Sequence, residues 1–183
     1  MQQKRRSPWQ VLNAGLLGAL LGMLWLGAAQ AFESSLPGAV ATTSVRMTVW
    51  GFEVYDAKLW ARPDFAPAQY GRHPFALELQ YLRGLKGGTI AQTSLDEMKR
   101  QGPINEQQSQ AWLKTMQGLF PDVKKGDRIT GVHKPEQGVE FWVNDRLVGQ
   151  VNDMQFAQLF FGIWLSPQTS APDLRKSLLA RWP

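Results

Sequence analysis

The sequence predicts an α+β domain in which a layer of helices covers an antiparallel sheet. Some segments alternate apolar and polar side chains with the period of a strand, and others carry an apolar stripe with the period of a helix. The strand-like segments are 45–60, 75–82 and 128–151, and the helix-like segments are 89–101, 105–120, 154–165 and 170–182. Because strands and helices come in runs and do not alternate one by one, the helices are expected to form a separate layer.

The first 31 residues are predicted to be a secretory signal peptide. Lys4, Arg5 and Arg6 precede an apolar run at about 11–28, and Ala29-Gln30-Ala31 has the pattern of a cleavage site. The alternative is a retained anchor, because the run approaches the roughly 20 residues that cross a membrane. We expect cleavage before Phe32, a domain at 32–183, a periplasmic location and no stable membrane span in the mature protein.

The composition excludes several classes of function. Removal of the signal leaves 17 Lys and Arg against 15 Asp and Glu, so nucleic-acid binding is not expected. The absence of cysteine excludes disulfides and thiolate ligands. His73 and His133 lie far apart, without the spacing of metal ligands, and are expected on the surface or at a strand edge. The residues 84–88 lack the spacing of a nucleotide loop, so no cofactor is expected.

The segment 44–60 is expected to form the first strands. Val45 and Met47 alternate with Arg46 and Thr48, so the two pairs should lie on opposite faces. Gly51 interrupts the pattern, which allows two strands or one bent strand. Two prolines in 62–69 favour a loop, and 75–82 returns as a strand with one buried face.

Cap and turn residues set the predicted limits of the later elements. Their positions are Thr89 with Gln92, Gly102-Pro103, Asn105 with Gln108, the turn 135–138, the turn Asn144-Asp145, Asp153, and Ser170 with Asp173. Between Asp153 and Ser170, apolar residues of 154–165 cover most of the helix circumference. That helix is therefore expected to be buried on nearly all sides.

Several segments, in order, resemble the bacterial chalcone-isomerase-like proteins. They are Arg46 with 50–60, then 74–98, 120–130, 160–165 and 174–179. The resemblance covers nearly the whole mature chain and implies the open-faced β-sandwich of chalcone isomerase.

The resemblance also implies a ligand site around Arg46. In chalcone isomerase an arginine of the corresponding strand holds the phenolate oxygen, and in fatty-acid-binding members it holds a carboxylate. Arg46 is accordingly expected to face a cleft between sheet and helices, with Thr48, Tyr55 and Tyr81 in or near the strands that form it. The alternative is an arginine on the outer face that pairs with Glu53 or Asp56.

Three functions follow as hypotheses. The first is a periplasmic protein that binds a small hydrophobic or amphipathic ligand, such as a fatty acid, without catalysis. The second is an intramolecular lyase or isomerase for a chalcone-like phenolic ketone, in which Arg46 stabilises an oxyanion. The third is a structural or interaction role. The catalytic motifs of the plant enzymes are not matched residue by residue, and this favours the first hypothesis.

Overall fold

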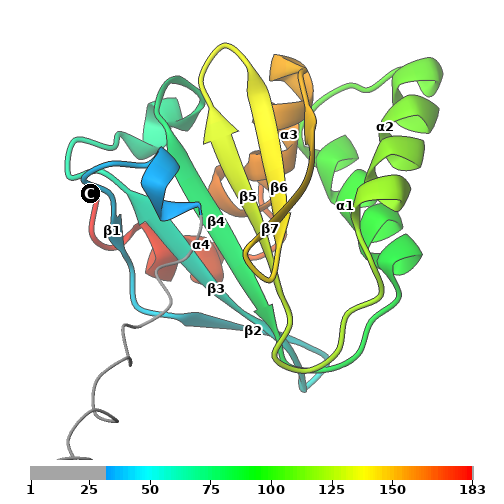
Figure 1. Ribbon diagram of the computed structural model, residues 1–183, viewed down its shortest axis with the longest axis horizontal. Helices are drawn as coiled ribbons and strands as arrows, with labels where there is room; N and C mark the ends of the chain where they lie inside the picture. Colours follow the sequence, from blue (N-terminus) through cyan, green and yellow to red (C-terminus); the bar gives the residue numbers. More distant parts are fainter. Residues whose placement is uncertain (1–31, 183) are drawn as a thin grey trace, which may run out of the picture.

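An antiparallel sheet of seven strands forms the centre of the computed structural model, which describes residues 32–182 (Figure 1). The strands are β1 (Val40–Ala41), β2 (Val45–Val49), β3 (Phe52–Ala61), β4 (Phe75–Tyr81), β5 (Arg128–Lys134), β6 (Gly138–Val143) and β7 (Arg146–Val151). Their order is β1-β3-β4-β5-β6-β7, and β2 pairs with the other half of the β3 edge that β1 uses. The signal-peptide prediction concerns residues outside this description.

Helices cover one face of the sheet and leave most of the other open. They are η1 (Glu33–Ser35), η2 (Pro67–Arg72), α1 (Gly87–Gln101), α2 (Glu106–Leu119), α3 (Met154–Leu165) and α4 (Pro172–Leu179). α3 and α4 lie across the sheet, whereas α1 packs on α3 and α2 lies beside α1 (Figure 1). The predicted α+β architecture with a helical layer is confirmed. No helix within residues 32–182 has the length and apolarity needed to cross a membrane.

Helix α3 is the centre of the main core, as predicted. Nine of its twelve residues are buried, including four aromatic side chains. Phe160 stacks on Phe156 at 5.5 Å between ring centroids and meets Phe141 of β6 at 5.1 Å. Helix α3 approaches β5 closely at Gly131, where a Cβ atom would lie only 3.2 Å from the Phe161 ring. Each such ring contributes roughly 1.5–3 kcal/mol through removal from water.

Two of the predicted caps are confirmed and two are wrong. Asn105 and Gln108 form a reciprocal capping box at α2, and Asp153 accepts from the backbone N–H of Phe156 at α3. The predicted Thr89 cap is wrong: α1 begins at Gly87, whose N–H donates to Asp122 Oδ1 at 3.0 Å. A side chain distant in sequence therefore satisfies a donor at this helix end, which no local pattern can reveal.

The predicted Ser170 cap of α4 is also wrong. The helix begins at Pro172, and proline fits a first turn because its missing N–H would have no partner there. Thr169 Oγ1 accepts from Ala171 N at 3.1 Å instead. The expected loop at 62–69 is confirmed for 62–66, and from Pro67 the chain forms η2, which also begins with a proline. At Gly51 the early run divides into two strands, one of the two predicted alternatives.

A second, smaller core lies on the open face. It contains Phe32, Leu36, Ala76 and Val132, and partly buried Trp60 packs against it. The rings of Phe32 and Trp60 meet edge to face at 5.6 Å between centroids. The segment around η1 therefore covers one end of the open face, and strands β2 and β3 carry charged side chains on the rest of that face.

Candidate functional site

The structure places Arg46 on the open face of the sheet, and the expectation that it faces an internal cleft is wrong. Its side chain is 49% exposed. Nε and Nη2 donate to the two carboxylate oxygens of Asp56 at 2.9 and 3.1 Å, and Nη1 donates to Glu53. The hydrogen bonds to Asp56 and then to Glu53 raise the pKa of Arg46. The alternative of an arginine paired on the outer face therefore describes its position.

The alternation of β2 explains this position. Val45 and Met47 pack against the main core, which turns Arg46 and exposed Thr48 to the other side. The predicted alternation was correct, whereas the face that the resemblance assigned to Arg46 was not. The apolar side chains decide the orientation, because burying a charged guanidinium against α3 and α4 would cost far more than burying Val45 and Met47.

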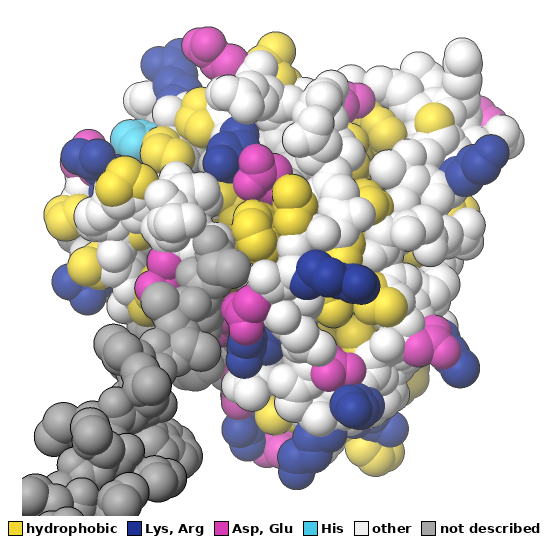
Figure 2. Space-filling view, in the orientation of Figure 1, with side chains coloured by type: hydrophobic (Ala, Val, Ile, Leu, Met, Phe, Trp, Pro, Cys, Tyr) yellow, Lys and Arg dark blue, Asp and Glu magenta, His cyan; other side chains and the backbone are white. Residues whose placement is uncertain are grey.

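The same open face carries a second group of ion pairs further along the sheet. Glu78 of β4 has a side chain that is only 5% exposed, and it lies 3.9 Å from Lys58 Nζ and 3.5 Å from Arg128 Nε. Arg128 also pairs with Asp145. Figure 2 shows basic and acidic side chains interspersed with apolar ones over this side of the molecule. Each charge has an opposite neighbour, so the group is a structural network on a solvated face.

Tyr55 and Tyr81 lie on the inner face, where the helices pack. They are direct neighbours across β3 and β4, and their rings meet edge to face at 6.2 Å between centroids. Trp164 of α3 donates its indole N–H to the Tyr55 hydroxyl at 3.0 Å. Among residues 32–182, no hydrogen bond reaches the Tyr81 hydroxyl, although Tyr81 is buried. The predicted site residues are thus divided between two faces: Tyr55 and Tyr81 inside, Arg46 and Thr48 outside.

Burial keeps both phenols neutral. It raises the pKa of Tyr55 to about 12, and the nearby charge of Glu97 acts in the same direction, whereas the bond from Trp164 opposes it. The pKa of Tyr81 is also raised, first by burial and then by Tyr55. At neutral pH the Tyr81 hydroxyl is therefore an uncharged donor that is free to bond an acceptor.

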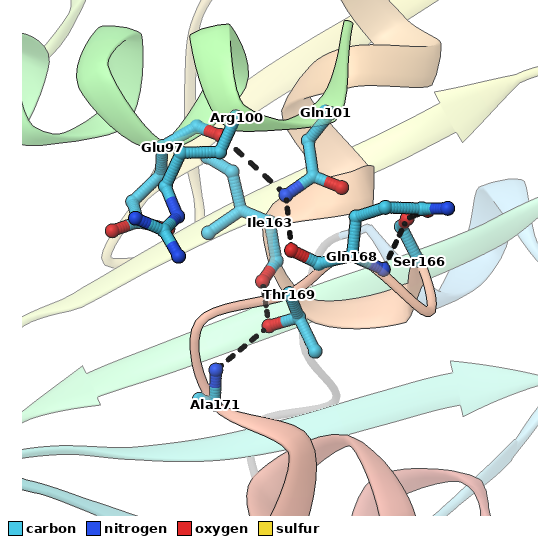
Figure 3. A network of polar contacts seen from close by, with 8 residues as sticks. All are labelled: Glu97, Arg100, Gln101, Ile163, Ser166, Gln168, Thr169 and Ala171. Atoms are coloured by element: carbon cyan, nitrogen blue, oxygen red, sulfur yellow. Dashed lines mark hydrogen bonds and ion pairs between the residues drawn. The ribbon is translucent and has the colours of Figure 1, made fainter.

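The polar contacts around Gln101 hold the end of α1 against the loop after α3 (Figure 3). Gln101 Nε2 lies 3.4 Å from the backbone oxygen of Gln168, and Thr169 Oγ1 donates to the backbone oxygen of Ile163 at 2.6 Å. Glu97, one turn before Gln101, has Oε2 at 3.6 Å from Arg100 Nε. These contacts fix the helix that carries Glu97 relative to Trp164.

Trp164 and Glu97 were not identified from the sequence. Trp164 was assigned only to the buried face of its helix, although a buried indole N–H needs an acceptor and could have indicated a polar partner. Glu97 had no such signal, because its proximity to Tyr55 depends on how α1 packs.

His133 is not a surface residue, which corrects the prediction for this histidine. It is 4% exposed, and its ring stacks on Phe75 at 4.9 Å between centroids. Nδ1 lies 2.7 Å from the backbone oxygen of His73, and since a carbonyl only accepts, Nδ1 carries the proton. Within residues 32–182 no group of three or more His, Asp or Glu side chains is arranged to hold a metal ion.

Two surface pockets lie away from the tyrosines. One, of about 240 Å³, is lined by Arg62, Asp64, Phe65, His73 and Pro74. The other, of about 200 Å³, lies between η1 and Trp60. Both are smaller than the roughly 300–1,000 Å³ of typical small-molecule sites. Beside the tyrosines, the space between sheet and helices is occupied by aromatic side chains.

Comparisons with known proteins agree with this fold. An uncharacterised protein of Haemophilus influenzae is 32% identical over 133 residues, which is 72% of this chain and 64% of that protein. The chain thus spans less than two thirds of this relative's length.

A solved structure, that of the Arabidopsis thaliana fatty-acid binding protein AtFAP1, superimposes with a TM-score of 0.61. The alignment covers 78% of this chain and 87% of the plant protein at 11% sequence identity, so it speaks for the fold alone. The chalcone isomerase-like family matches residues 40–180, a range that includes strands β1 to β7 and helices α1 to α4. This chain belongs to the chalcone isomerase-like family.

Proposed function

We propose that this protein binds a small hydrophobic molecule between sheet and helices, without catalysis, and that the Tyr81 hydroxyl donates a hydrogen bond to it. The observation that carries the proposal is the hydroxyl of buried Tyr81, which makes no hydrogen bond with residues 32–182 and belongs to an aromatic interior. Ligand sites combine apolar walls with a few polar groups that fix orientation. The similarity in fold to a plant fatty-acid binding protein supports the same class of ligand.

The inner face suits an uncharged acceptor better than a free carboxylate. Both tyrosines are neutral donors, and the nearest acidic influence, Glu97, would oppose a second negative charge. Arg46, the cation expected to neutralise a carboxylate, lies across the sheet with two carboxylates of its own. We therefore propose an acyl ester, a protonated fatty acid or a similar carbonyl compound as the ligand.

Binding at this position requires the helical layer to move. Aromatic side chains of α3 now fill the space beside the tyrosines. A ligand would take their place by shifting α3 or α1 from the sheet, a change that costs free energy and slows association. We therefore expect the ligand-free protein to bind its ligand slowly.

The outer position of Arg46 also supports a binding protein over an isomerase. Closure of a chalcone ring passes through a phenolate, which needs a preorganised positive group or strong donors. With Arg46 on the outer face, the polar groups that residues 32–182 place at the two tyrosines are their hydroxyls and the Trp164 indole N–H, with the carboxylate of Glu97 nearby. Turnover of a chalcone by the wild-type protein would overturn the non-catalytic part of the proposal.

The test is a titration of a fluorescent fatty acid and its methyl ester against wild type and Tyr81→Phe. The ester should bind at least as tightly as the acid. Tyr81→Phe should weaken the ester by about 1 kcal/mol, the value of one neutral hydrogen bond, or roughly fivefold. Failure of both ligands to bind the wild type would remove the binding function and leave a structural or interaction role.

We also propose that the mature protein is periplasmic and begins at Phe32. The support is the order of basic, apolar and Ala-x-Ala segments in residues 4–31. The intact mass of the protein from a periplasmic extract tests this location and start. Recovery of the uncut chain in the membrane fraction alone would contradict it.

A further inference from the structure

The turn between β2 and β3 exposes three apolar side chains. Trp50 is 95% exposed, Phe52 61% and Val49 42%. A large aromatic side chain is seldom left almost wholly in water, because its burial is among the most favourable of any residue. Three such residues on one turn form a small apolar tip, which we call the Trp50 tip.

The backbone geometry of the turn is unfavourable for a tryptophan at position 50. Trp50 and Gly51 have φ of +49° and +81°, a geometry that favours Asn, Asp or Gly. The β6–β7 turn has the same geometry, and it uses Asn144 and Asp145 at φ of +45° and +68°. A tryptophan in this conformation makes the turn less stable than those residues would. The needs of the turn therefore do not account for a tryptophan at this position.

Basic side chains surround the Trp50 tip. Backbone bonds from Leu82 to Val54 and from Gly126 to Tyr81 bring the loops 82–86 and 122–127 beside it. Arg83 lies 5.1 Å from the Phe52 ring centroid. Within residues 32–182, Arg83, Lys124 and Lys125 have no acidic partner within 4 Å.

The acidic groups of this end are already engaged. Glu53 pairs with Arg46, Asp122 pairs with Lys86, and Asp127 accepts from Lys124 N and Asn144 Nδ2. The lower end of the molecule in Figure 1, where the β2–β3 turn meets these loops, is where Figure 2 shows basic side chains gathered. The charge of Asp127 is attracted to Lys124, which leaves Arg83 and Lys125 as basic side chains that no acidic group of residues 32–182 pairs with, so this end is complementary to an anionic surface.

We propose that this end of the molecule docks on an anionic lipid surface, with the Trp50 tip inserted at the level of the headgroups. Tryptophan favours this zone because its ring is apolar and its N–H is polar. Lys and Arg beside it then meet lipid phosphates. A protein partner would need a broad face of about 800 Å² on each side, whereas the tip is a projecting turn of three apolar residues.

The docking rests on these surface features alone and does not depend on the proposed ligand. The two are nevertheless close in space, because Tyr81 bonds to Asp127 and Gly126 in the basic loop through its backbone. A ligand taken from a bilayer would therefore reach the inner face from the docked end.

The test is flotation of the purified protein with vesicles of phosphatidylcholine, alone or mixed with phosphatidylglycerol. Wild type should bind the mixed vesicles more strongly and lose that preference at high salt. Trp50→Gly should weaken binding on the order of tenfold, as loss of one buried aromatic side chain implies. Its thermal midpoint should stay the same or rise, because glycine suits the positive φ.

The matched control is Met154→Ser. Met154 is 62% exposed and follows β7 at the opposite end of the sheet, so its loss should leave binding unchanged. Deuterium exchange localises the contact: mixed vesicles should protect the turn and the loop 122–127. This local readout is separate from any vesicle binding by the N-terminal segment. Equal exchange with and without vesicles, or equal binding by Trp50→Gly, would overturn the proposal. Self-association that needs Trp50 and no lipid would assign the tip to a protein contact and overturn it as well.

Discussion

The two faces of the sheet are built on different physical principles. The inner face buries aromatic and aliphatic side chains against α3 and α4, and its polar groups are neutral. On the open face, Arg46, Lys58 and Glu78 are held in ion pairs, and apolar packing is confined to the neighbourhood of η1. Since strand alternation sends neighbouring residues to opposite faces, Arg46 and Tyr55 cannot be assumed to share a site because they are close in sequence. Ligand binding is expected where burial is deep, on the inner face.

The largest expected effect is that of a charge on the inner face. Phe160→Asp places a carboxylate among Phe141, Phe156 and Trp164. It should lower the free energy of unfolding by several kcal/mol, roughly the 4–5 kcal/mol of the most damaging substitutions. Chemical denaturation measures this loss. A midpoint equal to that of the wild type would mean that α3 does not pack as described.

On the open face, truncation in the smaller core should cost less. Phe32→Ala removes the ring that meets Trp60 and opens the contact of η1 with Val132. We expect a loss of about 2–3 kcal/mol, below the full range for a central phenylalanine, because solvent can enter at this edge. The same denaturation assay applies. A loss as large as that of Phe160→Asp would contradict the expectation that the smaller core contributes less to the free energy of unfolding.

Acid should destabilise the inner face through His133. Burial lowers the pKa of its ring from the usual value of about 6.5, so the unfolded state binds a proton more readily than the folded state. This contribution to stability is thus lost as the pH drops from about 6.5 towards the lowered pKa, below which both states are protonated and the loss levels off. The slope stays below about 1.4 kcal/mol per pH unit, the limit for the uptake of one proton.

The variant His133→Asn isolates this contribution. An asparagine amide can still donate to the backbone oxygen of His73 but does not titrate. Unfolding measured between pH 5 and 6.5 should be less steep in pH for the variant than for the wild type. Identical slopes would show that His133 is not the group responsible.

The two tyrosine hydroxyls of the inner face should contribute differently to stability, because Tyr55 accepts a hydrogen bond from Trp164 and Tyr81 makes none with residues 32–182. Tyr55→Phe removes the acceptor for Trp164 and leaves its indole N–H without a partner, so it should cost about 1 kcal/mol or slightly more. Tyr81→Phe breaks no bond and should leave stability unchanged. Thermal unfolding of both variants checks this difference, and equal losses would indicate a partner for Tyr81 as well.

The smallest expected effect is that of Arg46→Ala. Its ion pairs lie in solvent, where they contribute little to stability. Thermal unfolding should change little, and binding of the acyl ester should be unaffected. A selective loss of fatty-acid binding would return Arg46 to the ligand site.

The sequence predicted the elements better than it predicted their contacts. Alternation and local caps identified the strands, the Asn105 and Asp153 helix starts and the buried α3, because these features are encoded within a few residues. Gly87 and Asp122, or Trp164 and Tyr55, meet only in the folded chain. Arg46 was misplaced for a different reason: the resemblance turned it toward the helices, whereas the apolar Val45 and Met47 of the same alternation lie on the face that the helices cover.

The most direct test of the inner-face site is photolabelling with a fatty acyl ester that carries a diazirine, followed by peptide mapping. With the ligand between sheet and helices, label should appear on peptides that contain Tyr81 and Trp164, and it should decrease with excess unlabelled ester. Label concentrated on the strand that contains Arg46 and Thr48, with Tyr81 and Trp164 unmodified, would contradict the assignment.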